Sequence, residues 1–209
     1  MIDRSNLKGV LPSNFGWLDY KLSPKDLDHV WKCIKNKKES HGHTLAGNID
    51  SSYRLEDTDD WFFNNVLQPL TIQYSESFNN MGKKVPINNM VPYHLYTWWV
   101  NYQKQNEFNP IHDHTGVYSF VIWMKIPTSY EEQNLNKINN TKRISAFDFQ
   151  YTDTLGRISN FTYQLSPELE GTMLFFPSKL NHQVYPFFNC DETRISVSGN
   201  VGLDITKRL

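Results

Sequence analysis

Three histidines have the residue type and spacing that could bind a metal. His112 and His114 are separated by one residue, just before a stretch that alternates like a β-strand, and His182 follows late in the chain. Residues two apart on a strand point to the same face, so His112 and His114 can meet one metal while Asp113 points away. With a third histidine on another strand, such a pair can hold a first-row metal that keeps open positions for substrate. The competing interpretation is a chance match in a half-exposed loop.

Arg194 favours the interpretation of the histidines as a metal site, because an inward-facing arginine indicates that an anionic ligand binds in the same region. On a strand it shares a face with Ser196, while the intervening Ile195 packs on the other side. A buried guanidinium is costly unless an anion meets it, and its planar fork matches a carboxylate bidentately. The alternative is a salt bridge at the surface or between domains.

Two further polar side chains and a second histidine pair are weaker candidates. Asn101 and Gln103 share a strand face with Trp99, and consecutive polar residues on one face meet either solvent or a pocket. We include both in the candidate ligand site. His41 and His43 repeat the His-x-His spacing, but they lie in a polar loop without a third ligand nearby. We expect them to be solvated, with a role as a lid as the alternative.

The elements that must position these residues begin with helices. Ser23 and Pro24 supply a cap and a first helical residue for a helix over 25–35. A second, longer helix is predicted over about 59–80, with a kink at Pro69. The polar stretch between the two helices is predicted to be a loop.

From about His94 onward the pattern has a period of two. The stretches rich in β-branched and aromatic residues are predicted strands: residues 94–103, 117–125, 144–151, 172–176 and 193–201. The Asn-rich stretch 131–142 is a predicted surface loop. We therefore predict a single domain over 1–209, with a helical N-terminal part over 1–90 and an antiparallel β core over 91–203.

Composition excludes several classes of function. The chain has 209 residues, 14% aromatic residues and a formal net charge of -1, from 21 Lys+Arg against 22 Asp+Glu. No bulk charge attracts it to nucleic acid or to an anionic membrane. It has only two cysteines, no apolar leader segment and no stretch of about 18 apolar residues. We expect a β-rich cytoplasmic protein, and the oligomeric state is not predicted.

Two stretches resemble the Fe(II)- and 2-oxoglutarate-dependent oxygenases of the prolyl-hydroxylase-like branch, in particular uncharacterised members common in marine bacteriophages and bacteria. These stretches are WVNYQKQNEFNPIHDHTGVYSFVIWMKIP, residues 99–127, and GTMLFFPSKLNHQVYPFFNCDETRISVSGNV, residues 171–201. The specific motifs are a histidine pair before a strand, Phe-Pro-Ser before a histidine, and Arg-Ile-Ser before Gly-Asn. The resemblance covers about residues 90–202 and extends weakly to residues 46–49.

This resemblance implies an α+β, mainly β fold: a double-stranded β-helix, or cupin-like jelly roll, with N-terminal helices buttressing one sheet. It implies a dioxygenase that binds Fe(II) at the mouth of the barrel and uses molecular oxygen and 2-oxoglutarate, releasing succinate and carbon dioxide. An unidentified small molecule or peptide would be hydroxylated at a C–H bond. Arg194 and Ser196, with Asn101 and Gln103, would hold 2-oxoglutarate. A phage-encoded member would act in the host cytoplasm.

One residue departs from the family pattern, because most members have His-x-Asp or His-x-Glu where this chain has His112 and His114. Three ligand sets follow: the three histidines His112, His114 and His182; a bulged backbone that turns Asp113 inward; or two histidines completed by water. Strand alternation favours the three histidines, which requires no distortion. Loss of the metal is a further alternative.

Two other classes of function remain open. A cupin-like three-histidine metal enzyme would not use 2-oxoglutarate and would have little need for Arg194. A non-catalytic binding module would keep the barrel and use Arg194 to bind a carboxylated ligand. The fold alone cannot separate these from an oxygenase.

Overall fold

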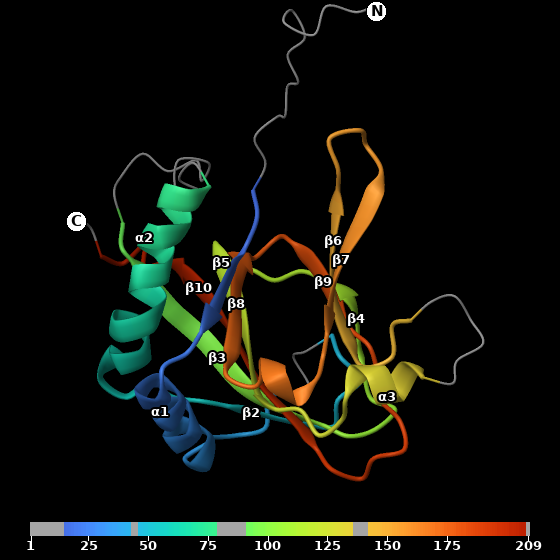
Figure 1. The fold of residues 1–209 in the computed structure, drawn as a ribbon. Helices are drawn as coiled ribbons and strands as arrows, with labels where there is room; N and C mark the ends of the chain where they lie inside the picture. The colour runs from blue at the N-terminus through green and yellow to red at the C-terminus, as the bar shows by residue number, and fades with distance from the viewer. Residues whose placement is uncertain (1–14, 43–45, 79–90, 136–141, 208–209) are drawn as a thin grey trace, which may run out of the picture.

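The computed structural model describes residues 15–42, 46–78, 91–135 and 142–207, which form two facing antiparallel sheets with the two N-terminal helices on one side (Figure 1). The six-stranded sheet has the order β1-β8-β5-β10-β3-β2, and the four-stranded sheet has the order β4-β9-β6-β7. The strands of the larger sheet are β1 Leu18–Lys21, β2 Ser51–Arg54, β3 Tyr93–Gln103, β5 Tyr118–Lys125, β8 Thr172–Pro177 and β10 Arg194–Leu203. Those of the smaller sheet are β4 Asn109–His112, β6 Ala146–Thr152, β7 Ile158–Gln164 and β9 Asn181–Val184.

Two apolar layers hold this arrangement together. Between the sheets, Val121 and Trp123 of β5 pack with Phe147 and Phe149 of β6. On the outer face of the larger sheet, a second cluster joins the strands to helices α1 (Pro24–Lys35) and α2 (Gln68–Ser77), which Figure 1 shows on the side away from the smaller sheet. The predicted fold, a double-stranded β-helix buttressed by N-terminal helices, is confirmed.

Both predicted helices are present, and the second contains a π-helical turn just before Pro69. Helix α1 begins with a capping box between Ser23 and Asp26. Before α2, residues Phe63–Leu67 form a π-helical turn, in which the N–H of Gln68 donates to the carbonyl of Phe63. A proline cannot donate and clashes with the preceding turn, and a wider turn accommodates both effects. Residues 79–80 of the predicted helix lie outside the described residues.

The polar N-terminal loop and the Asn-rich loop both contain regular structure that the sequence pattern did not indicate. Strand β2 lies in the predicted loop and pairs with β3, and β1 pairs with β8. The helical N-terminal part therefore also contributes two strands to the larger sheet. A short helix, α3 (Tyr130–Asn134), occupies the start of the Asn-rich stretch. Elements of four or five residues are too short for their periodicity to stand out.

Each of the five strands predicted from alternation is present, namely β3, β5, β6, β8 and β10. In the described part of the chain, no helix is long and apolar enough to cross a membrane.

Candidate metal centre

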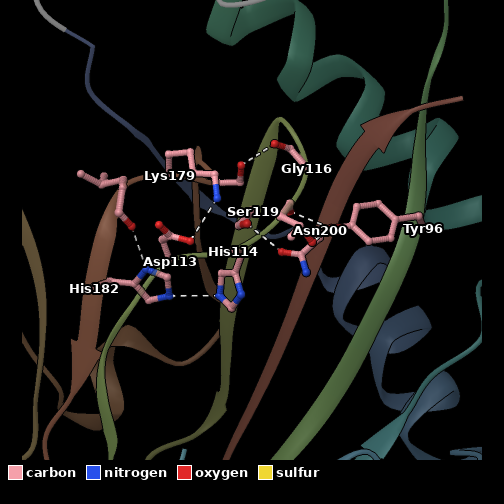
Figure 2. Close-up of polar contacts among 11 residues, drawn as sticks. Tyr96, Asp113, His114, Gly116, Ser119, Lys179, His182 and Asn200 are labelled. Atoms are coloured by element: carbon pink, nitrogen blue, oxygen red, sulfur yellow. Dashed lines mark hydrogen bonds and ion pairs between the residues drawn. The ribbon is translucent and has the colours of Figure 1, made fainter. Parts of the chain in front are cut away.

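The three histidines come together where the smaller sheet meets the loop that leads into β5. His112 ends β4 and pairs directly with His182 of β9 in the sheet register. His114 lies just beyond β4, and its Nε2 is 3.2 Å from Nε2 of His182 (Figure 2). One nitrogen from each of the three rings lies within 4.8 Å of the other two.

Backbone carbonyls orient two of the three rings. Nδ1 of His112 is 2.7 Å from the carbonyl oxygen of Pro110, and Nδ1 of His182 is 2.9 Å from that of Leu180. A carbonyl only accepts, so each Nδ1 carries the proton and each Nε2 keeps its lone pair. These two lone pairs are therefore available to a metal.

Burial keeps the histidines neutral. Desolvation lowers the pKa of His112 and that of His114, the latter to about 4, and lowers the pKa of His182 well below its usual value. Neutral imidazole is the form that binds metals. Two nitrogens each about 2.1 Å from one first-row metal, at a right angle, lie about 3.0 Å apart. The spacing of His114 and His182 fits this arrangement.

Asp113 lies outside the histidine cluster. Its Oδ1 is 3.2 Å from Nζ of Lys179, and its side chain is 44% exposed. The pairing of β4 with β9 does shift register between Asn109 and His112, so the backbone is irregular near Pro110. This irregularity brings no oxygen of Asp113 into the cluster of candidate ligands.

Arg194 lies in the same region and could bind an anion. It is 1% exposed, its guanidinium lies 4.7 Å from the ring centre of Phe187, and no acidic side chain in the described part of the chain forms an ion pair with it. Its Nη1 donates to Oε1 of Gln103 at 3.3 Å, its Nη2 donates to Oγ of Ser145, and its Nε has no partner. Burial lowers the pKa of Arg194 to about 9. A buried, unpaired guanidinium with a free donor fits a bound carboxylate.

One cavity contains both the histidine cluster and Arg194. Its lining includes the three histidines, Arg194 and Ser196, and apolar side chains from both sheets. In the register of β10 with β3, Arg194 faces Gln103 and Ser196 faces Asn101, so all four residues lie on the inner face. The sequence-based interpretation of these four as pocket residues agrees with this placement.

The structure adds contacts that the sequence did not indicate. Ser52 Oγ donates to Oδ1 of Asn101 at 2.7 Å, which leaves the amide nitrogen of Asn101 for the cavity. Ser145 and Phe187 contact the guanidinium of Arg194 from loops next to the strands. These residues have no motif of their own, so no sequence signal could have found them.

The prediction of a solvated His41 is wrong. His41 is only 6% exposed, its ring centre lies 5.4 Å from that of Trp99, and its Nδ1 accepts from Nε of Arg54 at 3.3 Å. The cause is β2, because the backbone N–H of His41 donates to the carbonyl of Ser52 and the loop folds against the sheet. His43 lies outside the described residues.

The depressed histidine pKa values predict acid sensitivity of the metal-free protein. Between the usual pKa of 6.5 and the folded pKa of about 4 for His114, the unfolded chain binds more protons than the folded one. These histidines therefore contribute no loss of stability above pH 6.5. Below that pH, the free energy of unfolding falls as the pH drops toward 4. Urea denaturation of the metal-free protein at pH 7.5, 6 and 5 measures this fall. A His182→Gln variant should lose less; an equal loss in both proteins would assign the effect to other groups.

Comparison with known proteins places this geometry in a family. A family model described as "Putative 2OG-Fe(II) oxygenase" matches residues 97–200. No curated protein sequence matches the chain.

The fold also matches solved structures. A viral collagen prolyl hydroxylase from Paramecium Bursaria Chlorella virus-1 is 13% identical with a TM-score of 0.51, over 88% of this chain and 94% of that one. The carbocyclase SnoK from nogalamycin biosynthesis is 10% identical with a TM-score of 0.53, over 91% and 80% of the two chains. The epimerase SnoN from the same biosynthesis is 14% identical with a TM-score of 0.51, over 90% and 77%. At these identities the similarity shows the double-stranded β-helix fold.

The family match covers the histidine pair, His182 and Arg194. The chain therefore belongs to the 2-oxoglutarate- and Fe(II)-dependent oxygenases.

Proposed function

We propose that His112, His114 and His182 hold Fe(II) and that Arg194 anchors 2-oxoglutarate, for hydroxylation of a C–H bond in a small molecule or peptide. The observation that carries this assignment is the buried, unpaired Arg194 at one end of the cavity whose other end holds the three neutral histidines. A cupin-like enzyme that does not use 2-oxoglutarate would have no use for this cation. A binding module would have no use for three convergent imidazoles.

Different residues of the cavity would bind the metal and the cosubstrate. Bound Fe(II) supplies the activation of dioxygen and the oxidative decarboxylation of 2-oxoglutarate to succinate and carbon dioxide. The histidines contribute three neutral donors, so they leave the charge of the metal to be balanced by the cosubstrate. The guanidinium of Arg194 binds the far carboxylate, and Ser196 and Asn101 supply polar contacts along the same face. Gln103 orients Arg194 through the contact at 3.3 Å.

The apolar walls of the cavity have a separate role. Trp123, Phe147 and Phe176 are among the residues that line it. They exclude water from the space around the cosubstrate, which strengthens the contact between Arg194 and a carboxylate.

The setting of the protein is part of the proposal. We assign residues 1–209 to one oxygenase domain, since the matched region and the N-terminal helices share one apolar layer. Both cysteines, Cys33 and Cys190, are free, which suits the reducing cytoplasm. Nucleic acid is not the expected substrate of a chain with a net charge of -1.

Anaerobic addition of Fe(II) and then 2-oxoglutarate to the metal-free protein tests this function. We expect a weak visible charge-transfer band that requires both additions, and slow Fe(II)-dependent formation of succinate once air is admitted. Iron binding without the band would support a three-histidine enzyme that does not chelate 2-oxoglutarate. Neither iron binding nor succinate, with a panel of candidate substrates supplied, would support a binding module.

Iron retention should also depend on the cosubstrate. Three neutral ligands leave more positive charge on Fe(II) than two histidines and a carboxylate do, so the doubly negative 2-oxoglutarate adds more to the stability of the complex. We expect more iron to survive desalting when 2-oxoglutarate is present. Equal retention with and without it would contradict the three-histidine assignment.

A further inference from the structure

A second cavity borders the histidine centre on the same face of the larger sheet. Its volume is about 410 Å³, and Arg54, Tyr96, Thr97 and Asn200 are among the residues that line it. Trp99, Asp113 and His114 line both this cavity and the cavity that contains Arg194. A molecule in the second cavity would therefore lie against His114 without occupying the place of 2-oxoglutarate.

The sheet register shows how the two cavities are related. Along β10 and β3, the inner face carries the pairs Arg194 with Gln103, Ser196 with Asn101, Ser198 with Trp99, and Asn200 with Thr97. The first pair lies at the Arg194 end, and the last pair lies in the second cavity. Trp99 lies between them, with its ring centre 5.8 Å from that of His114. The second cavity is thus the continuation of the face beyond the histidine centre.

Asn200 presents an unused pair of donors to this cavity. Its side chain is 5% exposed, and its Oδ1 accepts from Oγ of the fully buried Ser119 at 2.7 Å (Figure 2). The contact with Ser119 fixes the amide so that its nitrogen is directed away from Ser119. Within the described residues, this nitrogen has no hydrogen-bond partner. The nitrogen is thus an unused donor on the wall of the cavity, which favours a ligand with an acceptor oxygen.

Arg54 adds a positive charge to the same cavity. Its Nε donates to Nδ1 of His41 and lies 3.6 Å from Oε1 of Glu39, which is 69% exposed and solvated. The terminal nitrogens of Arg54 have no hydrogen-bond or ion-pair partner in the described part of the chain. A solvated ion pair such as that with Glu39 contributes little. The fork of Arg54 therefore remains available to an anion.

Asp113 adds one negative charge to the wall of this cavity, and an exposed cation lies beside it. Asp113 pairs with Lys179 at 3.2 Å, as Figure 2 shows. His114, which burial keeps neutral, adds no charge of its own to this wall. The cation beside Asp113 and the neutral His114 together reduce the repulsion that an anion would meet here.

We propose that the second cavity binds a carboxylate group of the substrate, with Arg54 and Asn200 donating to its oxygens. The class of substrate is thus a small carboxylate or a peptide that presents one, and this assignment of the oxidised molecule rests on the proposed oxygenase function. One guanidinium and one amide match the single charge and two oxygens of a carboxylate better than the double charge of a phosphate.

NMR of the metal-free protein can test the cavity directly, without any turnover. The probes are butyrate and its neutral isostere butyramide, with methylphosphonate as the phosphate-like arm. The side-chain amide of Asn200 and the Nε–H of Arg54 report on the second cavity, and the Nε–H of Arg194 reports on the first. We expect butyrate to shift the Asn200 and Arg54 signals saturably, with at least tenfold weaker binding of butyramide. Tighter binding of methylphosphonate than of butyrate would overturn the carboxylate assignment.

Two variants and a matched control complete the test. Arg54→Gln and Asn200→Asp should each weaken the butyrate response in the second cavity at least tenfold, and Arg54→Gln should leave the Arg194 response unchanged. Arg157→Gln removes the same charge from an ion pair with Asp153 in the turn between β6 and β7, and it should have no effect. An equal loss in Arg54→Gln and Arg157→Gln would overturn the proposal.

The NMR experiment can distinguish failure of the proposed carboxylate site from failure of the proposed 2-oxoglutarate anchor. Shifts at Arg194 alone would overturn the carboxylate site beside His114 while supporting the proposed anchor for 2-oxoglutarate. Shifts at Asn200 and Arg54 without any at Arg194 would support the second cavity and count against the anchor.

Discussion

Replacement of Arg194 with alanine should lower the affinity for 2-oxoglutarate by at least about thirtyfold while leaving iron affinity unchanged. Truncation of one partner of a buried, charge-assisted pair costs about 2–5 kcal/mol, and about 2 kcal/mol corresponds to thirtyfold. The loss should not fall below this value, because Arg194 is 1% exposed and its Nε has no protein partner that would compete for the donor. Titration of the charge-transfer band with 2-oxoglutarate under anaerobic conditions gives the affinity.

Two substitutions separate the anchor from a structural role. Arg194→Lys should recover only part of the affinity, because an ammonium cannot reproduce the planar fork. Arg194→Met keeps much of the volume without the charge, and it should fold while binding 2-oxoglutarate as poorly as the alanine variant. If all three variants bind 2-oxoglutarate like the parent, Arg194 has only a structural role.

Loss of iron is the second large effect that we expect, from alanine substitution of His112, His114 or His182. Each residue contributes one nitrogen to a cluster within 4.8 Å, so each substitution removes one of three protein ligands. Removal of a partner beyond the ligands typically costs about 10–100-fold in metal affinity, and removal of a ligand should cost more. Iron content after desalting, measured with and without 2-oxoglutarate, gives the result.

Asp113 supplies the matched control for the histidines. It is adjacent to His112 and His114 in sequence, but its carboxylate pairs with Lys179, so Asp113→Ala should retain iron. His114→Asp should also retain iron, with less dependence on 2-oxoglutarate, because a carboxylate ligand adds a negative charge beside Fe(II). Loss of iron in Asp113→Ala together with its retention in His114→Ala would replace our ligand set with one that includes Asp113.

The sequence by itself determined the long elements and the main candidates for chemistry. Strands such as β3 and β10, with 11 and 10 residues, repeat the two-residue period often enough to be recognised. The spacing of His112 and His114 predicted that they could share a ligand, and the placement of Arg194 beside Ser196 predicted a common face. The common face of Arg194 and Ser196 follows from strand geometry, whereas His114 lies just beyond β4 and reaches the cluster from a loop.

Only the tertiary structure decided which distant side chains meet and which charges stay unpaired. The four-residue strands β2 and β9 bury His41 and place His182 opposite His112, and neither result follows from a pattern four residues long. The unpaired Nε of Arg194 depends on neutral neighbours such as Ser145, which is 49 residues away in sequence. The burial of a side chain and the pairing of its charge both depend on contacts with segments that are remote in the sequence. The chemistry of each residue is therefore local, but its availability to a ligand is set by the whole fold.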